Sequence, residues 1–134
     1  ILTVMTAQEK AWSDNDLDLS FFPHNLQIVK AWLPKVGGEQ NMNYQFVSTI
    51  NGLNCVQTEY VIKVRGDEYY SNLHTVEDSI KSNPNKIWSA PIFFRHFKHF
   101  KYHISDHIIG GKTQEILALD EAINKLVQES TPPE

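Results

Sequence analysis

The chain has 134 residues, of which 41% are hydrophobic and 21% are charged, and its formal net charge is -4. This length and composition suit a folded protein with one hydrophobic core and exclude a chain that is disordered throughout. The negative charge argues against a protein that coats nucleic acid with its whole surface. No apolar run reaches the ~18 residues of a membrane span, so we expect no membrane contact.

Two single residues bear on the setting and the extent of the chain. Cys55 is the one cysteine, so no internal disulfide can form, and we expect an intracellular, cytoplasmic protein. Because translation begins at Met, Ile1 suggests an excised domain, a processed product, or added residues ahead of a start at Met5. We therefore expect residues 1–134 to form a single domain, cut from a longer chain in the first case, with residues 130–134 as a frayed tail.

The first third of the sequence predicts one short helix and a linker. Residues 23–33 are expected to be helical, because their apolar side chains recur at helical spacing and Pro34 ends the pattern. Residues 37–43 begin with two glycines and are otherwise polar, which predicts a linker.

Residues 44–73 predict a three-stranded antiparallel meander. Strand-forming residues alternate along the first segment, and Asn51-Gly52 is the dipeptide that type I′ hairpin turns favour. A second turn is expected at residues 65–68, which read Arg-Gly-Asp-Glu. The predicted strands are residues 44–50, 53–64 and 68–73. Three strands need a covering layer to be stable, so helices should lie on one face of this sheet.

Two later segments have helical patterns. Residues 75–81 predict a short helix that Thr75 caps. Residues 113–129 predict a longer C-terminal helix, whose apolar side chains form one stripe and whose acidic residues lie early in the helix. The order of elements predicts an α+β fold.

Residues 91–111 hold four of the six histidines within a dense run of aromatic and basic residues. Read as a helix, the segment places phenylalanine and isoleucine side chains on one face and the histidines on the next face. Gly110-Gly111 would then end the helix. A strand is the alternative, since phenylalanine, tyrosine and isoleucine are strand formers. In the helical reading, the rings face the core while the imidazoles and cations face water.

The leading hypothesis for function is a non-enzymatic binding domain that docks a protein partner through this basic, aromatic, histidine-rich surface. The sequence contains no complete catalytic constellation, so we predict no catalytic residue and no cofactor. Residues 59–78 are acidic and residues 95–112 basic, which favours an acidic partner or self-association into a homo-oligomer. The predicted partner-binding residues are Arg95, His96, Lys98, His99, Lys101, Tyr102 and His103.

Two alternatives use the same segment. His99 and His103 have the i, i+4 spacing that lets two imidazoles of one helix reach one metal ion, and His107 could add a third ligand. Zinc or another transition metal would suit these nitrogen ligands, although neighbouring lysines oppose a cation. The interleaved cations and rings would also suit single-stranded nucleic acid. That function requires exposed rings, whereas an amphipathic helix would bury them.

Overall fold

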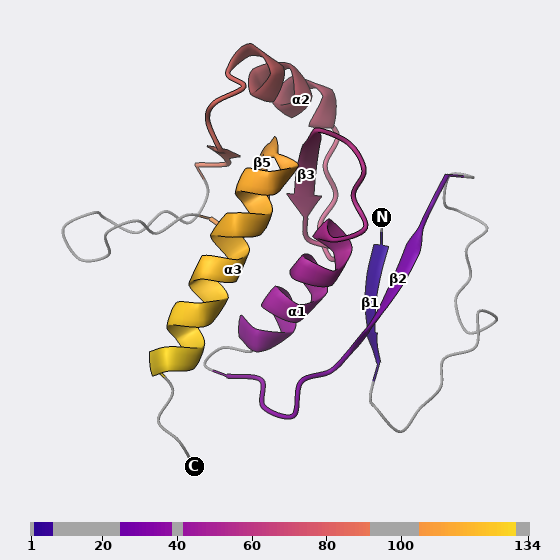
Figure 1. Cartoon of the computed structure of the whole chain (residues 1–134). Helices are drawn as coiled ribbons and strands as arrows, with labels where there is room; N and C mark the ends of the chain where they lie inside the picture. The colour runs from indigo at the N-terminus through magenta and orange to yellow at the C-terminus, as the bar shows by residue number, and fades with distance from the viewer. Residues whose placement is uncertain (1, 7–24, 39–41, 92–104, 131–134) are drawn as a thin grey trace. The chain divides into compact units, whose positions relative to one another are not determined.

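The computed structural model describes residues 2–6, 25–38, 42–91 and 105–130, and the structural statements below concern these residues (Figure 1). They form two compact units, one of Ile1–Val56 with Leu119–Glu134 and the other of Gln57–Ala118. The elements in chain order are β1 (Leu2–Thr6), β2 (Ile28–Trp32), α1 (Met42–Leu53), β3 (Tyr60–Val64), α2 (Leu73–Ser82), β4 (Trp88–Ser89), β5 (Ile108–Lys112) and α3 (Thr113–Ser130).

The first unit contains a two-stranded parallel sheet and helix α1. Strands β1 and β2 pair from Leu2↔Ile28 through Thr6↔Trp32, and α1 packs against both strands. The buried apolar residues described in this unit are Ala31, Phe46 and Leu53. Phe46 and Leu53 lie about two turns apart on one face of α1, because an α-helix has about 3.6 residues per turn. This face supplies the apolar contacts of the unit.

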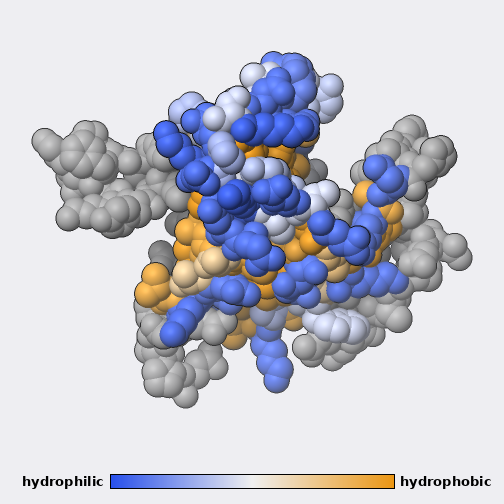
Figure 2. All heavy atoms as spheres, turned by 45° about the horizontal axis from the view of Figure 1, so that its top comes forward, coloured by the Kyte–Doolittle hydropathy of each residue, from blue (hydrophilic) through white to orange (hydrophobic). Residues whose placement is uncertain are grey.

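The second unit contains a three-stranded antiparallel sheet in the order β3-β5-β4. The central strand β5 pairs with β3 from Tyr60↔Lys112 through Val64↔Ile108, and with β4 at Trp88↔Gly110. Helix α2 packs against β4 and β5. Its outer face is polar, and hydrophilic residues cover the upper face of the view where α2 lies (Figure 2). The core contains Ile80, Ala90, Ile108 and Ile116.

Gly110 of the central strand lets neighbouring segments approach closely, whereas Gly111 would meet only ordinary contacts if it carried a Cβ atom. A Cβ atom on Gly110 would overlap the Cδ1 atom of Ile80 and would lie 3.3 Å from the carbonyl oxygen of Val61. A Cβ atom on Gly111 would lie 3.5 Å from the carbonyl oxygen of Lys86. Glycine in the middle of a strand often marks such a close approach. The prediction that these glycines end a helix is therefore wrong.

The predicted fold class is confirmed. The described residues contain three antiparallel strands in one sheet and three helices, one of them C-terminal, which is an α+β arrangement. The predicted helices at residues 75–81 and 113–129 correspond to α2 and α3. Among the described helices, none has the length and apolar character that crossing a bilayer would require. The prediction of a single domain remains a prediction.

The predicted residue ranges of the three meander strands are wrong. Residues 44–50 lie in α1, since Phe46, Ile50 and Leu53 also recur at helical spacing and this packing outweighs strand propensity. Gly52 lies inside α1, and the one described glycine with a positive φ is Gly38, at 70°. Of residues 53–64, Tyr60–Val64 is strand. Residues 68–72 form a loop that leads into α2, and Leu73 begins the helix.

Two other predicted helices need correction. Within residues 23–33, the regular structure described is strand β2, which a parallel pairing with β1 stabilises. At the end of the histidine-rich segment, Ile108 begins strand β5, so a helix does not continue through it. The prediction for residues 92–104 lies outside the described residues.

Candidate functional site

A group of polar side chains gathers where β3 ends and β5 begins. Because these strands are antiparallel neighbours, the loop after β3 lies beside the residues that precede β5. The backbone N–H of Arg65 donates to the carbonyl oxygen of His107 at 3.2 Å, which extends the strand pairing by one residue. We call this group the charged loop cluster. Its members are Arg65, Asp67, Glu68, Tyr70, Asp106 and His107.

Arg65 and Asp67 form a two-pronged ion pair across the turn. Arg65 Nε donates to Asp67 Oδ1 at 2.9 Å, and Nη2 donates to Oδ2 at 2.7 Å. The hydrogen bond from Arg65 lowers the pKa of Asp67 to about 2, and the same bond raises the pKa of Arg65. Arg65 also lies 3.7 Å from an Asp106 oxygen and 3.8 Å from a Glu68 oxygen. One guanidinium therefore faces three carboxylates.

Glu68 lies between a hydroxyl and an imidazole. One of its oxygens accepts a hydrogen bond from the Tyr70 hydroxyl, and the other contacts Nδ1 of His107. The bond from Tyr70, followed by that from His107, lowers the pKa of Glu68. An ionised carboxylate can only accept, so the contact requires a hydrogen on Nδ1 of His107. Glu68 thus sets the orientation of the imidazole.

Two further hydrogen bonds brace the start of β5 against β3 and its loop. The single hydrogen of the Tyr70 hydroxyl is shared between Glu68 and the carbonyl oxygen of His107, which lies 2.9 Å from the hydroxyl oxygen. Lys63 Nζ donates to the carbonyl oxygen of Asp106 at 2.6 Å. These bonds join residues about 40 positions apart in the sequence. The charged loop cluster is therefore held at both of its segments.

The cluster offers acceptors and donors of several kinds but no arrangement for a metal. Among the described residues, no group of three or more histidine, cysteine or acidic side chains could hold a metal ion. His107 precedes a strand rather than lying on a helix, so the helical spacing behind the metal hypothesis does not extend to it. His99 and His103 lie outside the described residues, and the metal site stays a prediction.

All of the residues predicted to bind a partner lie outside the described residues, and the charged loop cluster was not predicted as a site. The outlying residues are Arg95, His96, Lys98, His99, Lys101, Tyr102 and His103. The turn at residues 65–68 was predicted, but His107 lay in a segment for which helix and strand were both open. A strand assignment for residues 108–112, paired with residues 60–64, would have brought His107 to the turn.

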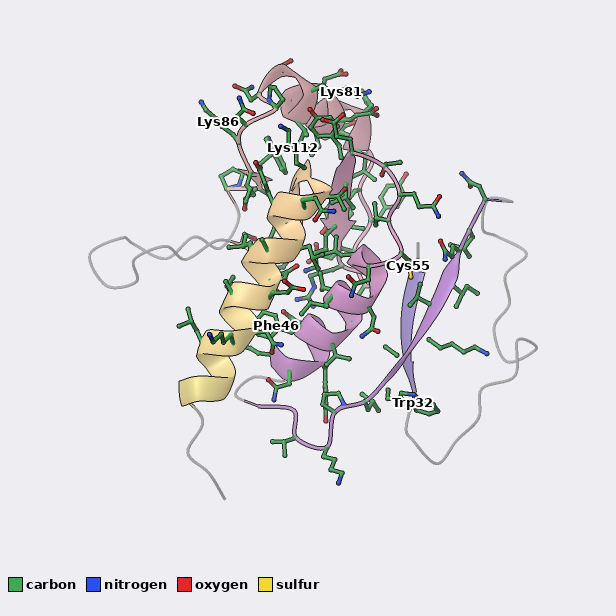
Figure 3. The ribbon with its side chains drawn as sticks, viewed as in Figure 1. Trp32, Phe46, Cys55, Lys81, Lys86 and Lys112 are labelled. Carbon is green, nitrogen blue, oxygen red and sulfur yellow. The ribbon has the colours of Figure 1, made fainter. Side chains whose placement is uncertain are left out.

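Three other lysines of the second unit, Lys81, Lys86 and Lys112, lie around α2 and the far end of β5 (Figure 3). Lys81 pairs with Glu77 at 2.5 Å, and Lys112 Nζ lies 3.4 Å from Asn85 Oδ1. Lys112 is the last residue of β5, whereas His107 precedes the first, so the strand separates these cations from the charged loop cluster. They do not neutralise its carboxylates.

A cavity between β3 and α2 is mostly apolar, unlike the charged loop cluster. Its volume is about 260 Å³, and most of its lining is apolar. Its charged lining residues, Glu77 and Lys81, are paired with each other. The lining residues are Tyr60, Val61, Ile62, Glu77, Ile80 and Lys81. Without convergent unpaired polar groups, the cavity is a weaker candidate than the charged loop cluster for recognition of a polar substrate.

The hydroxyl of Tyr70 should ionise unusually late. Burial and the hydrogen bond to Glu68 raise its pKa from 10.0 to about 12. A folded-state pKa above the unfolded value means that this stabilisation is present below pH 10 and is lost as the pH rises towards 12. Tyrosinate absorbance should show this ionisation as the difference between wild type and Tyr70→Phe. In Glu68→Gln, the midpoint should move towards 10.0; an unchanged midpoint would contradict the assigned cause.

Asp67 should make the free energy of unfolding depend on pH in the acid range. Its pKa is 3.8 ordinarily and about 2 in the folded chain, so its contribution is present above pH 3.8 and is lost as the pH falls towards 2. In denaturant titrations at several pH values, the free energy of unfolding should fall more steeply with decreasing pH in wild type than in Asp67→Asn. Arg65→Gln, which weakens the ion pair but keeps the carboxylate of Asp67, should flatten the dependence of the free energy of unfolding on pH over the same range. Superimposable profiles would contradict the role of the pair.

A comparison with protein-family models gives a match over most of the chain. A family model described as WavE lipopolysaccharide synthesis matches residues 29–125, which is most of the chain and includes the whole charged loop cluster. Comparisons with curated proteins and with solved structures gave no match.

Proposed function

The chain belongs to the WavE lipopolysaccharide synthesis family, and from this membership we propose that it acts in lipopolysaccharide synthesis and binds a polar substrate at the charged loop cluster. The observation that carries the proposal is that the family match spans the cluster completely. A lipopolysaccharide contains a polysaccharide, so the substrates and intermediates of its synthesis are rich in hydroxyl groups. The carboxylates of the cluster can accept hydrogen bonds from hydroxyls, and its guanidinium can donate.

Exposure supports binding at this cluster. The side chains of Asp67 and Asp106 are 65% and 45% exposed, so a ligand can reach carboxylate oxygens that Arg65 does not fully occupy. An ionised carboxylate has about four acceptor positions, and the two bonds from Arg65 use two of those on Asp67. The remaining positions are available to a substrate without loss of the ion pair. The cluster is thereby both braced and accessible.

Disruption of the encoding gene tests the role in lipopolysaccharide synthesis. The lipopolysaccharide of the disrupted strain should change in gel mobility and in mass, and wild-type protein should restore it. The double variant Asp67→Asn/Asp106→Asn should fail to restore it at equal protein abundance. A matched control, Asp78→Asn/Glu115→Gln, removes two exposed carboxylates outside the cluster and should restore it fully. Unchanged lipopolysaccharide after disruption would contradict the role, and restoration by Asp67→Asn/Asp106→Asn would contradict the site.

A second proposal is the docking of an acidic protein partner through the histidine-rich segment. The specific observation is the sequence asymmetry between acidic residues 59–78 and basic residues 95–112. The variant His96→Ala/Lys98→Ala/Lys101→Ala should then lose most of the partner that wild type captures. Equal capture by both proteins would end this proposal. Metal binding and binding of single-stranded nucleic acid through the same segment remain predictions.

A further inference from the structure

Tyr70 of the charged loop cluster and its neighbour in the chain, Tyr69, have opposite surroundings. Tyr70 turns towards β5 and bonds to Glu68 and to the backbone of His107. Tyr69 is 91% exposed, the highest exposure among the described large hydrophobic residues that are exposed. At that exposure the ring of Tyr69 contributes little to the stability of the fold, because little of its surface is removed from water. The ring is therefore available to a ligand.

The loop that carries Tyr69 is held on both sides of it. Before it, Arg65 bonds to Asp67 and to the backbone of His107; after it, Tyr70 bonds to the same carbonyl oxygen. Glu68, the immediate neighbour, contacts the imidazole of His107. A braced loop loses little freedom when a ligand binds, so an aromatic ring on it is pre-organised for contact. Exposed aromatic side chains on rigid segments are typical of recognition surfaces.

The charges around Tyr69 favour a neutral ligand over an anionic one. Asp67, Glu68 and Asp106 bring three negative charges, while Arg65 and Lys63 bring two positive charges, so the region has a net charge of about -1 when the imidazole is neutral. An anionic group would also have to compete with Asp67 for the guanidinium. A neutral hydroxyl can donate to Asp67 without breaking the ion pair between Arg65 and Asp67.

We propose that Tyr69 is a stacking platform for a neutral saccharide ring, with a hydroxyl of that ring donating a hydrogen bond to the carboxylate of Asp67. This inference rests on the proposed function, because it assigns the class of substrate that the charged loop cluster holds. A saccharide ring has a face of C–H groups and a rim of hydroxyls. The face complements an aromatic ring, and the rim complements a carboxylate two residues away on the same loop.

The test is direct binding of oligosaccharide to the full chain. The probe is the oligosaccharide released by mild acid from the lipopolysaccharide of the encoding bacterium, used with its phosphate groups and after their removal. Titration calorimetry should show that wild type binds the dephosphorylated probe and that Tyr69→Ala binds it about tenfold more weakly, while Tyr69→Trp keeps binding. Saturation-transfer NMR should place the C–H face of a sugar ring against the protein. Trp32→Ala, which removes another exposed ring on β2, is the matched control and should bind as wild type does (Figure 3).

Each other outcome overturns the inference. Equal binding by wild type and Tyr69→Ala would remove Tyr69 from the site. Binding of the phosphorylated probe alone would replace the neutral saccharide with an anionic ligand, and no binding by wild type would exclude a saccharide site. The binding experiment and the gene disruption can fail separately. If disruption alters the lipopolysaccharide but Tyr69→Ala binds the probe as wild type does, the stacking role of Tyr69 alone is rejected. Unchanged lipopolysaccharide with Tyr69-dependent binding rejects the proposed role in synthesis.

Discussion

Replacing Ile116 with alanine should lower the free energy of unfolding by about 2–5 kcal/mol. Ile116 is 1% exposed and is the largest fully buried side chain described in the chain. Its Cδ1 atom lies against Gly111 of the central strand, 3.6 Å from where a Cβ atom on that glycine would be. Truncation removes apolar contacts and leaves a cavity in the core of the second unit, and both effects destabilise the folded chain. Denaturant titration of both proteins measures the difference.

The matched control lies on the same helix. Leu126 of α3 is 65% exposed, so Leu126→Ala should change the free energy of unfolding by no more than about 0.5 kcal/mol. Alanine is a better helix former than either isoleucine or leucine, so intrinsic helix preference cannot cause a loss of stability in either variant. A loss below about 1 kcal/mol for Ile116→Ala, or equal losses for the two variants, would contradict the assignment of Ile116 to the core.

Replacing Gly110 with alanine should lower the free energy of unfolding by about 1–3 kcal/mol, because it overfills the core. The added methyl group would overlap the Cδ1 atom of Ile80, and the backbone carbonyl of Val61 limits movement on the other side. Ile80 is 2% exposed and lines the cavity between β3 and α2, so its Cδ1 atom can move aside only by giving up its present contacts in the core. Either α2 moves away from β5 or Ile80 turns towards the cavity, and both changes lose packing. Denaturant titration measures the loss.

Two comparisons isolate the cause. At Gly66, a Cβ atom would meet nothing within 4 Å, and φ does not lie in the left-handed region, so Gly66→Ala should change the free energy of unfolding by no more than about 0.5 kcal/mol. Ile80→Val removes the overlapping atom, so the double variant Gly110→Ala/Ile80→Val should be more stable than the sum of the single effects indicates. An additive double variant would show that the overlap with Ile80 is not the cause.

Strand β5 links the core to the candidate site. Its buried residues, Ile108, Gly110 and Gly111, pack in the second unit, and the residue before its first, His107, belongs to the charged loop cluster. A change that displaces β5 from β3 would therefore weaken both the fold and the cluster. The side chains of Asp67, Tyr69 and Asp106 are exposed and take no part in this strand pairing, so replacing them leaves the pairing intact.

Only part of the candidate site could be predicted from the sequence. The turn at residues 65–68 and its charged composition follow from local sequence, since Gly66 and Asp67 are ordinary turn residues. The contact of Glu68 with His107 could not be predicted, because it depends on the pairing of β3 with β5 across about 40 residues. Helical and strand readings of residues 108–112 were both open, and the helical reading placed His107 on a different surface.

By itself, the sequence determined the α+β class and the positions of α2 and α3. These helices have apolar stripes and flanking residues that act within a few turns, so local pattern suffices. Only the tertiary structure decided that residues 42–53 are helical, that Gly110 and Gly111 lie in a central strand, and that the charged loop cluster exists. Each of these depends on contacts between segments far apart in the chain, where packing and strand pairing outweigh the preferences of individual residues.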